Sequence, residues 1–391
     1  MSFLRAARAA LASGSGIPRI LVAMVVVLAG LSFSCGGSGY TRSAPNHNAY
    51  VTLPQRGSVL QLNIDGATGV ITIGAETPQV ENSSPTGLAL LSSKKFLYTA
   101  NSRANTISIF NVASDGTLTL SGTPTPAGGS SPNAMVIDPT GKYLLVTNNL
   151  SDTVSVFSID AGSGALSPVG SPVFANASPT EILITHSGNF VYVTNPGLGM
   201  VTSFTFSNGV LQPMPTSPVI SGAGAFGLAA DGSGRFLYVA NPSAPNPSLN
   251  TTGNISGFNI DPTTGALTPM LGSPFTSGTS TVNNGPTALT LDPFGRFIYA
   301  TATGSSSSIW CFTITPTNGQ LVAVTNSPFS LAAGGLFALI DPSGNYFYTG
   351  TQTGNGIAAY TYNSSSGAPT VISGSPFSTT GTPPGKMVLS E

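Results

Sequence analysis

The stretch Gly188-Asn189-Phe190-Val191-Tyr192-Val193-Thr194-Asn195 decides the fold of this chain. A Gly-Asn turn is followed by alternating aromatic and β-branched residues, which are typical of a β-strand, and the strand ends at an asparagine. The same phrase returns at residues 95–101 and 235–241, and weaker copies are centred on Tyr50, Leu145, Tyr299 and Tyr348. The seven centres are separated by 48, 47, 47, 46, 61 and 49 residues.

Each copy belongs to a repeat of four strand-like segments. The unit from Ser131 to Val173 contains an apolar segment, a turn, the strand phrase, a period-two alternation and an irregular segment with a proline: 132–137, 138–142, 143–148, 152–160 and 165–169. A period in the high forties built from such segments is typical of a β-propeller. We therefore predict an all-β protein, a seven-bladed β-propeller of four-stranded blades.

The two ends of the chain complement each other. The first copy, around Tyr50, has no inner strand before it, whereas residues 384–389 have an inner-strand pattern with no second strand after it. We expect the C-terminal strand to pair into the N-terminal blade, because closing the ring in this way removes exposed sheet edges.

The composition excludes several classes of protein. Only 6% of the 391 residues are charged and the formal net charge is −1, with no basic run, so no nucleic-acid surface is indicated. Disorder is the competing interpretation of a chain rich in glycine and proline, but the regular spacing of apolar residues indicates folding. The two cysteines do not suggest a disulfide framework.

Residues 1–34 resemble a bacterial lipoprotein signal peptide. Three arginines precede the apolar run 20–31, which is too short to span a bilayer comfortably, and Cys35 follows shortly after it. We predict lipidation of Cys35, a polar tether over residues 35–45, and the propeller over residues 46–391. The protein would then be exported to the bacterial cell envelope and touch the membrane only through its lipid anchor. Plain secretion and an uncleaved anchor are the alternatives.

The repeats resemble those of the YVTN-repeat, lactonase-like family of seven-bladed β-propellers, over essentially residues 46–391. Some members resemble 6-phosphogluconolactonases and muconate-cycloisomerase-type enzymes, and others are secreted or surface proteins without established catalysis. The resemblance implies that an enzymatic member carries a Pro-His-x-His element at the start of an inner strand, with Arg and Glu nearby. The matching positions here, 132–135 and 179–182, contain no histidine. The two histidines of the chain are His47, in the tether region, and His186, in a turn.

Glu181 is the weak catalytic candidate, and Lys386 shares its position in the repeat. Both would begin an inner strand near the mouth of the central channel, in blades four and one, where they would orient a small ligand. We interpret them as solvated residues at the rim, with ligand binding as the alternative. Arg56, Arg103 and Asn133 are further binding candidates, because their loops and strand starts belong to the same face.

The other recurring polar residues are interpreted as structural. Asparagines that end the second strands are expected to bond loop backbone, and aspartates before glycine are expected to form turns. Cys311 follows Trp310 inside a strand and is interpreted as a small core residue. No metal-ligand spacing or phosphate loop is present in the sequence, so we expect no metal and no cofactor.

Because the family's histidines are missing, we interpret the protein as a non-catalytic binding or interaction scaffold at the cell envelope, without lactone hydrolysis. Its partner would be a small molecule, a glycan or a protein at one propeller face, and we expect a monomer. Two polar insertions, 242–250 and 276–285, lie where binding specificity often resides. The alternative function is a lactonase-type hydrolase resembling 6-phosphogluconolactonase, with Glu181 as the base.

Overall fold

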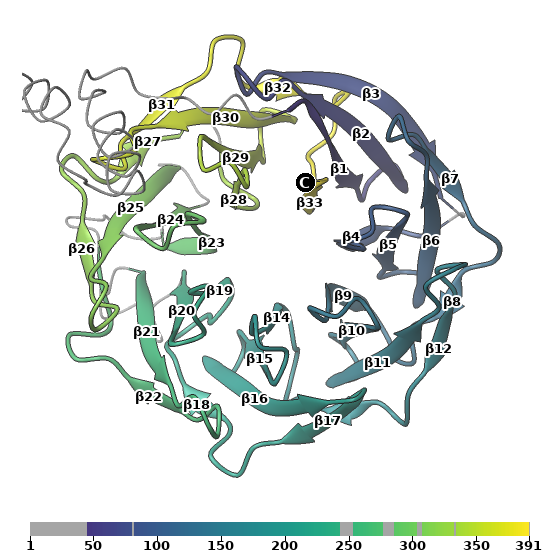
Figure 1. The fold of residues 1–391 in the computed structure, drawn as a ribbon, viewed down its shortest axis with the longest axis horizontal. Coiled ribbons are helices and arrows are strands. Elements are labelled where there is room, and N and C mark those ends of the chain that lie inside the picture. The colour runs from purple at the N-terminus through teal and green to yellow at the C-terminus, as the bar shows by residue number, and fades with distance from the viewer. Residues whose placement is uncertain are drawn as a thin grey trace, which may run out of the picture. The chain divides into compact units, whose positions relative to one another are not determined.

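The computed structural model describes residues 45–79, 82–242, 253–276, 285–302, 307–331 and 334–390. These residues form seven antiparallel β-sheets that are arranged as the blades of a ring (Figure 1). The predicted signal peptide, Cys35, nearly all of the tether and most of the two insertions lie outside the described residues. Among the described residues no helix has the length and hydropathy that a membrane span requires.

The blades follow the order of the chain, and each begins with a strand at the inner edge of the ring and ends with an outer strand. Blade one contains β33 (Met387–Leu389), β1 (His47–Leu53), β2 (Ser58–Ile64) and β3 (Ile71–Pro78). Blade two contains β4 (Pro85–Leu90), β5 (Phe96–Asn101), β6 (Thr106–Val112) and β7 (Leu118–Leu120). Blade three contains β9 (Pro132–Ile137), β10 (Tyr143–Asn148), β11 (Thr153–Ile159) and β12 (Leu166–Pro168). Blade four contains β14 (Ile182–Ile184), β15 (Phe190–Asn195), β16 (Met200–Ser207) and β17 (Val210–Pro213).

The remaining blades repeat this order. Blade five contains β19 (Leu228–Ala230), β20 (Phe236–Asn241), β21 (Asn254–Ile260) and β22 (Leu267–Pro269). Blade six contains β23 (Pro286–Leu291), β24 (Phe297–Ala302), β25 (Ser308–Ile314) and β26 (Leu321–Ala323). Blade seven contains β28 (Leu339–Ile340), β29 (Tyr346–Thr351), β30 (Gly356–Tyr362) and β31 (Pro369–Val371). In five blades a short further strand pairs with the third strand: β8 (Thr125–Pro126), β13 (Val173–Phe174), β18 (Val219–Ile220), β27 (Phe329–Ser330) and β32 (Phe377–Ser378).

The predicted closure of the ring is confirmed. β33 pairs antiparallel with β1, so that Ala49 lies opposite Leu389 and Val51 lies opposite Met387. Figure 1 shows this C-terminal strand at the inner edge of blade one, beside β1 from the start of the propeller. The seven-bladed, four-stranded prediction is therefore correct, including the strand exchange between the two ends.

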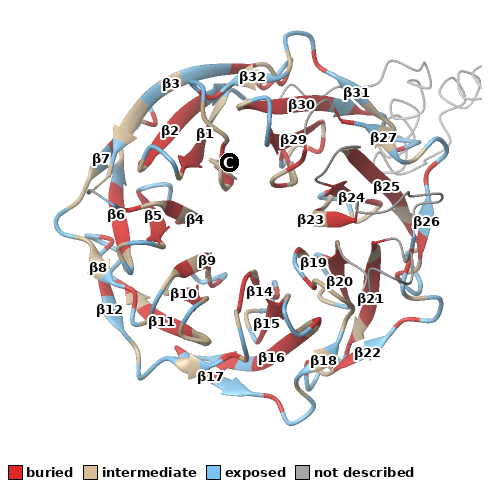
Figure 2. Ribbon diagram, turned by 180° about the vertical axis from the view of Figure 1, so that it is seen from behind, coloured by how far each residue is buried: buried red, intermediate tan, exposed pale blue. Residues whose placement is uncertain are grey.

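The core lies between blades. The second strand of a blade is buried on both faces because a neighbouring blade covers each side (Figure 2). Tyr192 of β15, for example, packs in one cluster with Leu237 and Val239 of β20. This position explains why the strand phrase reads as a run of aromatic and β-branched residues with few polar interruptions.

The tyrosine at the centre of the strand phrase links each blade to the next. Its buried hydroxyl donates to a glycine carbonyl in the outer turn of the following blade, as Tyr192 does to Gly265 at 2.8 Å. Burial raises the pKa of Tyr192 well above its usual value, so the hydroxyl stays protonated. Gly265 is required because its φ is +72° and a Cβ would lie 2.4 Å from Cδ1 of Phe190. Six blades share this hydrogen bond through Tyr50, Tyr98, Tyr192, Tyr238, Tyr299 and Tyr348, whereas blade three has Leu145.

We expect Tyr192→Phe to lower the free energy of unfolding by about 1–2 kcal/mol, because the buried Gly265 carbonyl loses its donor. Tyr362→Phe is the matched control, since Tyr362 is also buried but its hydroxyl has no hydrogen-bond partner among the described residues. Urea denaturation of both variants measures the difference. Equal midpoints for the two variants would contradict a stabilising role for the hydrogen bond between blades.

The recurring asparagines and aspartates have structural roles, but the expected bonds to loop backbone are confirmed for only some of the asparagines. Asn101 and Asn148 donate to side-chain hydroxyls of the neighbouring third strand instead. Asn195 is fully buried, and its Nδ2 donates to the carbonyls of Ala175 and Ala177 at 2.8 and 2.9 Å. Asp160 accepts hydrogen bonds from Ser163 and from the amide of Gly162, and these bonds lower the pKa of its carboxyl. Cys311 is fully buried, and burial raises the pKa of its thiol to about 12. A thiol that stays protonated is a poor nucleophile, so Cys311 is a core residue.

Candidate active site

Glu181 and Lys386 stand at equivalent positions on the inner edge of the ring. Glu181 immediately precedes β14 of blade four, and Lys386 immediately precedes β33 of blade one. The amide of Glu181 donates to Oγ1 of Thr194 at 3.1 Å, and the amide of Lys386 donates to Oγ1 of Thr52 at 2.9 Å. Each threonine belongs to the second strand of the same blade, so the shared register that the sequence predicts is correct.

The two side chains meet across the axis of the ring. Nζ of Lys386 donates to Oε1 of Glu181, and the side chains are 35% and 19% exposed, respectively. The ion pair was not predicted from the sequence, and both side chains remain partly exposed. Blades one and four face each other in a ring of seven, and both side chains extend from the inner edge far enough to bring opposite charges together.

A cavity of about 180 Å³ lies beside this ion pair. Its walls come from the starts of inner strands in blades four, five, six, seven and one. Apolar side chains such as Phe226, Leu228 and Phe337 belong to the lining, but polar groups supply most of its surface. Concave sites in which a few polar groups converge are the usual places where small ligands bind. At this volume the cavity lies below the roughly 300 Å³ at which drug-sized pockets begin, so it suits a compact molecule.

Neighbouring blades hold the Glu181 loop in place. Nδ2 of Asn133 in β9 donates to the carbonyl of Thr180 at 3.0 Å, from the side of blade three. Oγ1 of Thr194 donates to the carbonyl of Phe226 at 2.8 Å, on the side of blade five. Asn133, a predicted binding residue, thus supports the loop and is not among the residues that line the cavity.

The two predicted arginines lie away from this cavity. Arg56 is bound to Glu76 of β3, with 2.8 Å between Nη2 and Oε2, and its Nη1 donates to the carbonyl of Thr380 at 3.2 Å. Arg103 is exposed in the turn between β5 and β6. Neither arginine lines the cavity. Both belong to turns on the predicted face, but these turns join second and third strands and so lie farther from the axis than the inner strands.

The histidines do not contribute to the cavity either. His47 lies in β1 rather than in a tether, and its Nε2 is 3.3 Å from Oδ2 of Asp341 in blade seven. His186 lies in the turn after β14, at the opposite end of that strand from Glu181. Among the residues that the structure describes, no group of three or more His, Cys, Asp or Glu side chains is arranged to hold a metal ion.

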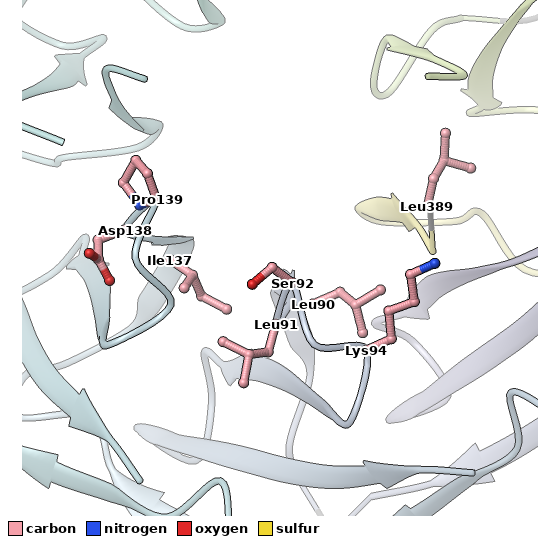
Figure 3. A pocket seen from close by; sticks show the side chains of 8 residues that line it. All are labelled: Leu90, Leu91, Ser92, Lys94, Ile137, Asp138, Pro139 and Leu389. Atoms are coloured by element: carbon pink, nitrogen blue, oxygen red, sulfur yellow. The ribbon is translucent and has the colours of Figure 1, made fainter. Parts of the chain in front are cut away.

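A second cavity, of about 330 Å³, lies at the other end of the inner strands (Figure 3). It contains Lys94 and Asp138 among mainly apolar residues such as Leu389. Figure 3 shows Asp138 turned away from Lys94, and the Asp138 carboxylate is occupied by the amides of Thr140, Lys142 and Tyr143 in its own turn. This cavity therefore has no converging acid and base.

Glu181 and Lys386 have the chemistry that acyl transfer to water needs. A carboxylate accepts a proton from water, and an ammonium donates to an oxygen that gains negative charge. Both side chains are partly buried, and such interactions are stronger there than in bulk water. The fold and the site together define a β-propeller with a small cavity near its axis, beside the ion pair of Glu181 and Lys386.

The chain belongs to the family described as Lactonase, 7-bladed beta-propeller, whose model matches residues 42–178 and 181–380. The match spans almost the whole propeller. It corrects our interpretation of the protein as a non-catalytic scaffold, and it favours the lactonase alternative. That interpretation treated the missing histidines as decisive, but a carboxylate also serves as a general base and the structure places one in the cavity. A search of curated proteins finds no match to this chain.

Solved structures share the fold. A proposed 6-phosphogluconolactonase from Bacteroides fragilis is 19% identical with a TM-score of 0.75, covering 91% of this chain and 100% of its own. A proposed 6-phosphogluconolactonase from Bacteroides uniformis is also 19% identical, with a TM-score of 0.74 and coverage of 88% and 100%. The periplasmic gluconolactonase of Pseudomonas aeruginosa is 18% identical, with a TM-score of 0.72 and coverage of 88% and 99%.

Proposed function

We propose that this protein is a lactonase-type hydrolase that opens small, unphosphorylated lactones in the cavity beside Glu181 and Lys386. The observation that carries the proposal is the carboxylate and ammonium pair beside a small cavity at the inner edge of the ring. Membership of the lactonase family and the similarity of fold to proteins named as gluconolactonases support the same reaction.

In the proposed reaction the lactone carbonyl lies against the ion pair, within reach of both charged groups. Glu181 accepts a proton from water while the water oxygen forms a bond to the carbonyl carbon. The carbonyl electrons move to oxygen, where Nζ of Lys386 stabilises the negative charge. The tetrahedral intermediate then expels the ring oxygen, which takes the proton from Glu181. The products balance as one hydroxy acid from one lactone and one water.

The charges around the cavity favour an unphosphorylated substrate. Lys386 is the one cation among the described residues that line the cavity, and Glu181 already neutralises it. A phosphate group is usually held by several Arg or Lys donors, whereas here it would also face the Glu181 carboxylate. We expect saturable hydrolysis of glucono-δ-lactone above the uncatalysed rate, with 6-phosphogluconolactone at least about tenfold poorer in kcat/KM, a difference worth roughly 1.4 kcal/mol. Absence of turnover with both lactones would contradict the proposed function.

We also propose that the protein is exported and anchored through a lipid on Cys35, on the strength of the basic, apolar and small-residue segments of residues 1–37. We expect Cys35→Ser to move the protein from the membrane fraction to the soluble or unprocessed fraction. Mass spectrometry of the mature wild-type protein checks the modification directly. An intact, unacylated Cys35 in that protein would exclude the anchor.

A further inference from the structure

A groove of about 600 Å³ lies on the face opposite the candidate active site. Glu181 and Lys386 precede inner strands, whereas this groove is formed by turns that follow inner strands and by outer turns, in blades five, six and seven. Residues 231–233, 235–236 and 293–297 form its inner wall, and Pro316 and Ser364 belong to its outer wall. The proposed lactonase reaction makes no use of it.

Phe294 in this groove departs from the repeat. The turn has a small hydroxyl residue at this position in five other blades, namely Ser93, Thr140, Ser187, Ser233 and Ser343. Three of those hydroxyls bond the aspartate of their own turn. Phe294 instead has a phenyl side chain at this position, and the residue is 63% exposed. The turn does not need an aromatic residue, and Phe294 gives the groove an exposed apolar surface beside its polar groups.

Two arginines line the same groove, at the position where other blades have Lys95, Lys142, Asn189 and Asn345. The guanidinium of Arg296 lies over Phe294, 4.7 Å from the ring centre, and that of Arg235 lies over Phe236 at the same distance. Nε of Arg296 donates to Asp292, and its Nη1 donates to the Ser364 carbonyl at 2.9 Å. These contacts fix the planes of the guanidinium groups before any ligand binds.

The groove presents positive charge to solvent and keeps negative charge beneath it. The side chains of Arg235 and Arg296 are 53% and 38% exposed, whereas those of their partners Asp231 and Asp292 are 10% and 0% exposed. Nη1 of Arg235 and Nη2 of Arg296 have no hydrogen-bond partner among the described residues. A ligand in the groove therefore meets unused guanidinium donors before it meets a carboxylate.

We propose that this groove binds an acidic saccharide, such as a short chain of uronic acid residues. The C–H face of a pyranose ring packs against a phenyl ring by dispersion, as Phe294 offers. Guanidinium groups recognise carboxylates through paired, charge-assisted hydrogen bonds. Ser364, Ser365 and Thr313 line the same groove and supply polar groups for sugar hydroxyls. The groove is built from turns and strand ends rather than from a free strand. An extended peptide therefore cannot bind there as an added strand through backbone hydrogen bonds.

The test is calorimetric titration of the full-length protein with tri-galacturonic acid, and with maltotriose as a neutral trisaccharide. Phe294→Ser and Arg235→Asn introduce the residues that other blades carry at these positions, so both variants should fold. We expect each to weaken binding of the acidic trisaccharide about tenfold or more. Phe174→Ser is the matched control, because Phe174 is also 63% exposed but lies in β13 of blade three. Binding by this control should equal that of the wild type.

Four results would overturn the proposal. The first is failure of the wild type to bind tri-galacturonic acid. The second is binding of this saccharide by Phe294→Ser and Arg235→Asn as tightly as by the wild type. The third is equally tight binding of maltotriose, which would show that the groove does not recognise the carboxylates. The fourth is competition by a tetraglutamate peptide as strong as that of the saccharide, which would assign the groove to acidic peptides. Lactone hydrolysis should be unchanged in both variants, so this proposal and the proposed function fail independently.

Discussion

Removal of residues 385–391 is expected to abolish both cooperative stability of the ring and any hydrolysis at its axis. The deletion takes away β33, whose residues 387–389 pair with β1, and buried Met387. It also removes the bonds between Thr52 and residues 385 and 386, at 2.7 and 2.9 Å. Several backbone hydrogen bonds at about 0.5–1.5 kcal/mol each and one buried side chain at about 1.5–3 kcal/mol amount to a loss on the order of 5 kcal/mol. That loss equals the whole stability of many domains.

Thermal and urea unfolding of the truncated protein measure this effect. Lys386→Met is the control variant, because it keeps the closing strand and removes only the ammonium. We expect Lys386→Met to unfold near the wild-type midpoint but to lose hydrolysis, which separates ring closure from chemistry. A truncated protein that melts at the wild-type temperature would disprove closure by the C-terminal strand as a source of stability.

Glu181→Gln is expected to lower kcat for lactone hydrolysis by about 10²–10⁴-fold, because the amide keeps the shape of the side chain but does not accept a proton from water. Substrate binding should change much less, so the effect should appear in kcat rather than in KM. Initial rates on glucono-δ-lactone, corrected for the uncatalysed reaction, measure it. Retention of wild-type kcat in Glu181→Gln would remove Glu181 from the reaction.

Glu76→Gln is the matched control for this variant. Glu76 is also a half-buried carboxylate in an ion pair, with a side chain that is 21% exposed beside Arg56, but it belongs to β3 at the outside of blade one. We expect its kcat to equal that of the wild type. The double variant Glu181→Lys with Lys386→Glu adds a further distinction: a purely structural pair would keep stability and activity after the exchange, whereas the proposed mechanism requires activity to be lost.

The candidate site was only partly predictable, as its individual residues illustrate. The register of Glu181 and Lys386 follows from the repeat, because equivalent positions in a repeat occupy equivalent positions in the ring. Their direct contact does not follow, since it depends on the width of the ring at its axis and on the direction of two side chains 205 residues apart. Arg56 and Arg103 lie on the predicted face, but they come from loops farther from the axis.

The groove at Phe294 has a signal in the sequence that the predictions from the repeat pattern did not include. The aligned turns show hydroxyl residues in five blades and phenylalanine in one, with arginine two residues later. The sequence alone does not show, however, that Arg235 of the preceding blade reaches the same groove. That proximity arises because turns of adjacent blades lie side by side around the ring, and the Arg235 side chain extends to Pro316 of blade six.

The sequence by itself determined the seven repeats, the four strands of each blade, the exchange of strands between the two ends and the structural role of the buried asparagines and turn aspartates. These features depend on local patterns and on a period, both of which a linear sequence records. The tertiary structure decided the features that depend on distances between blades: the hydrogen bonds from tyrosine to glycine, the Glu181–Lys386 contact and the groove at Phe294. Such contacts join residues from different repeats, and their geometry is set by how the sheets pack around the ring.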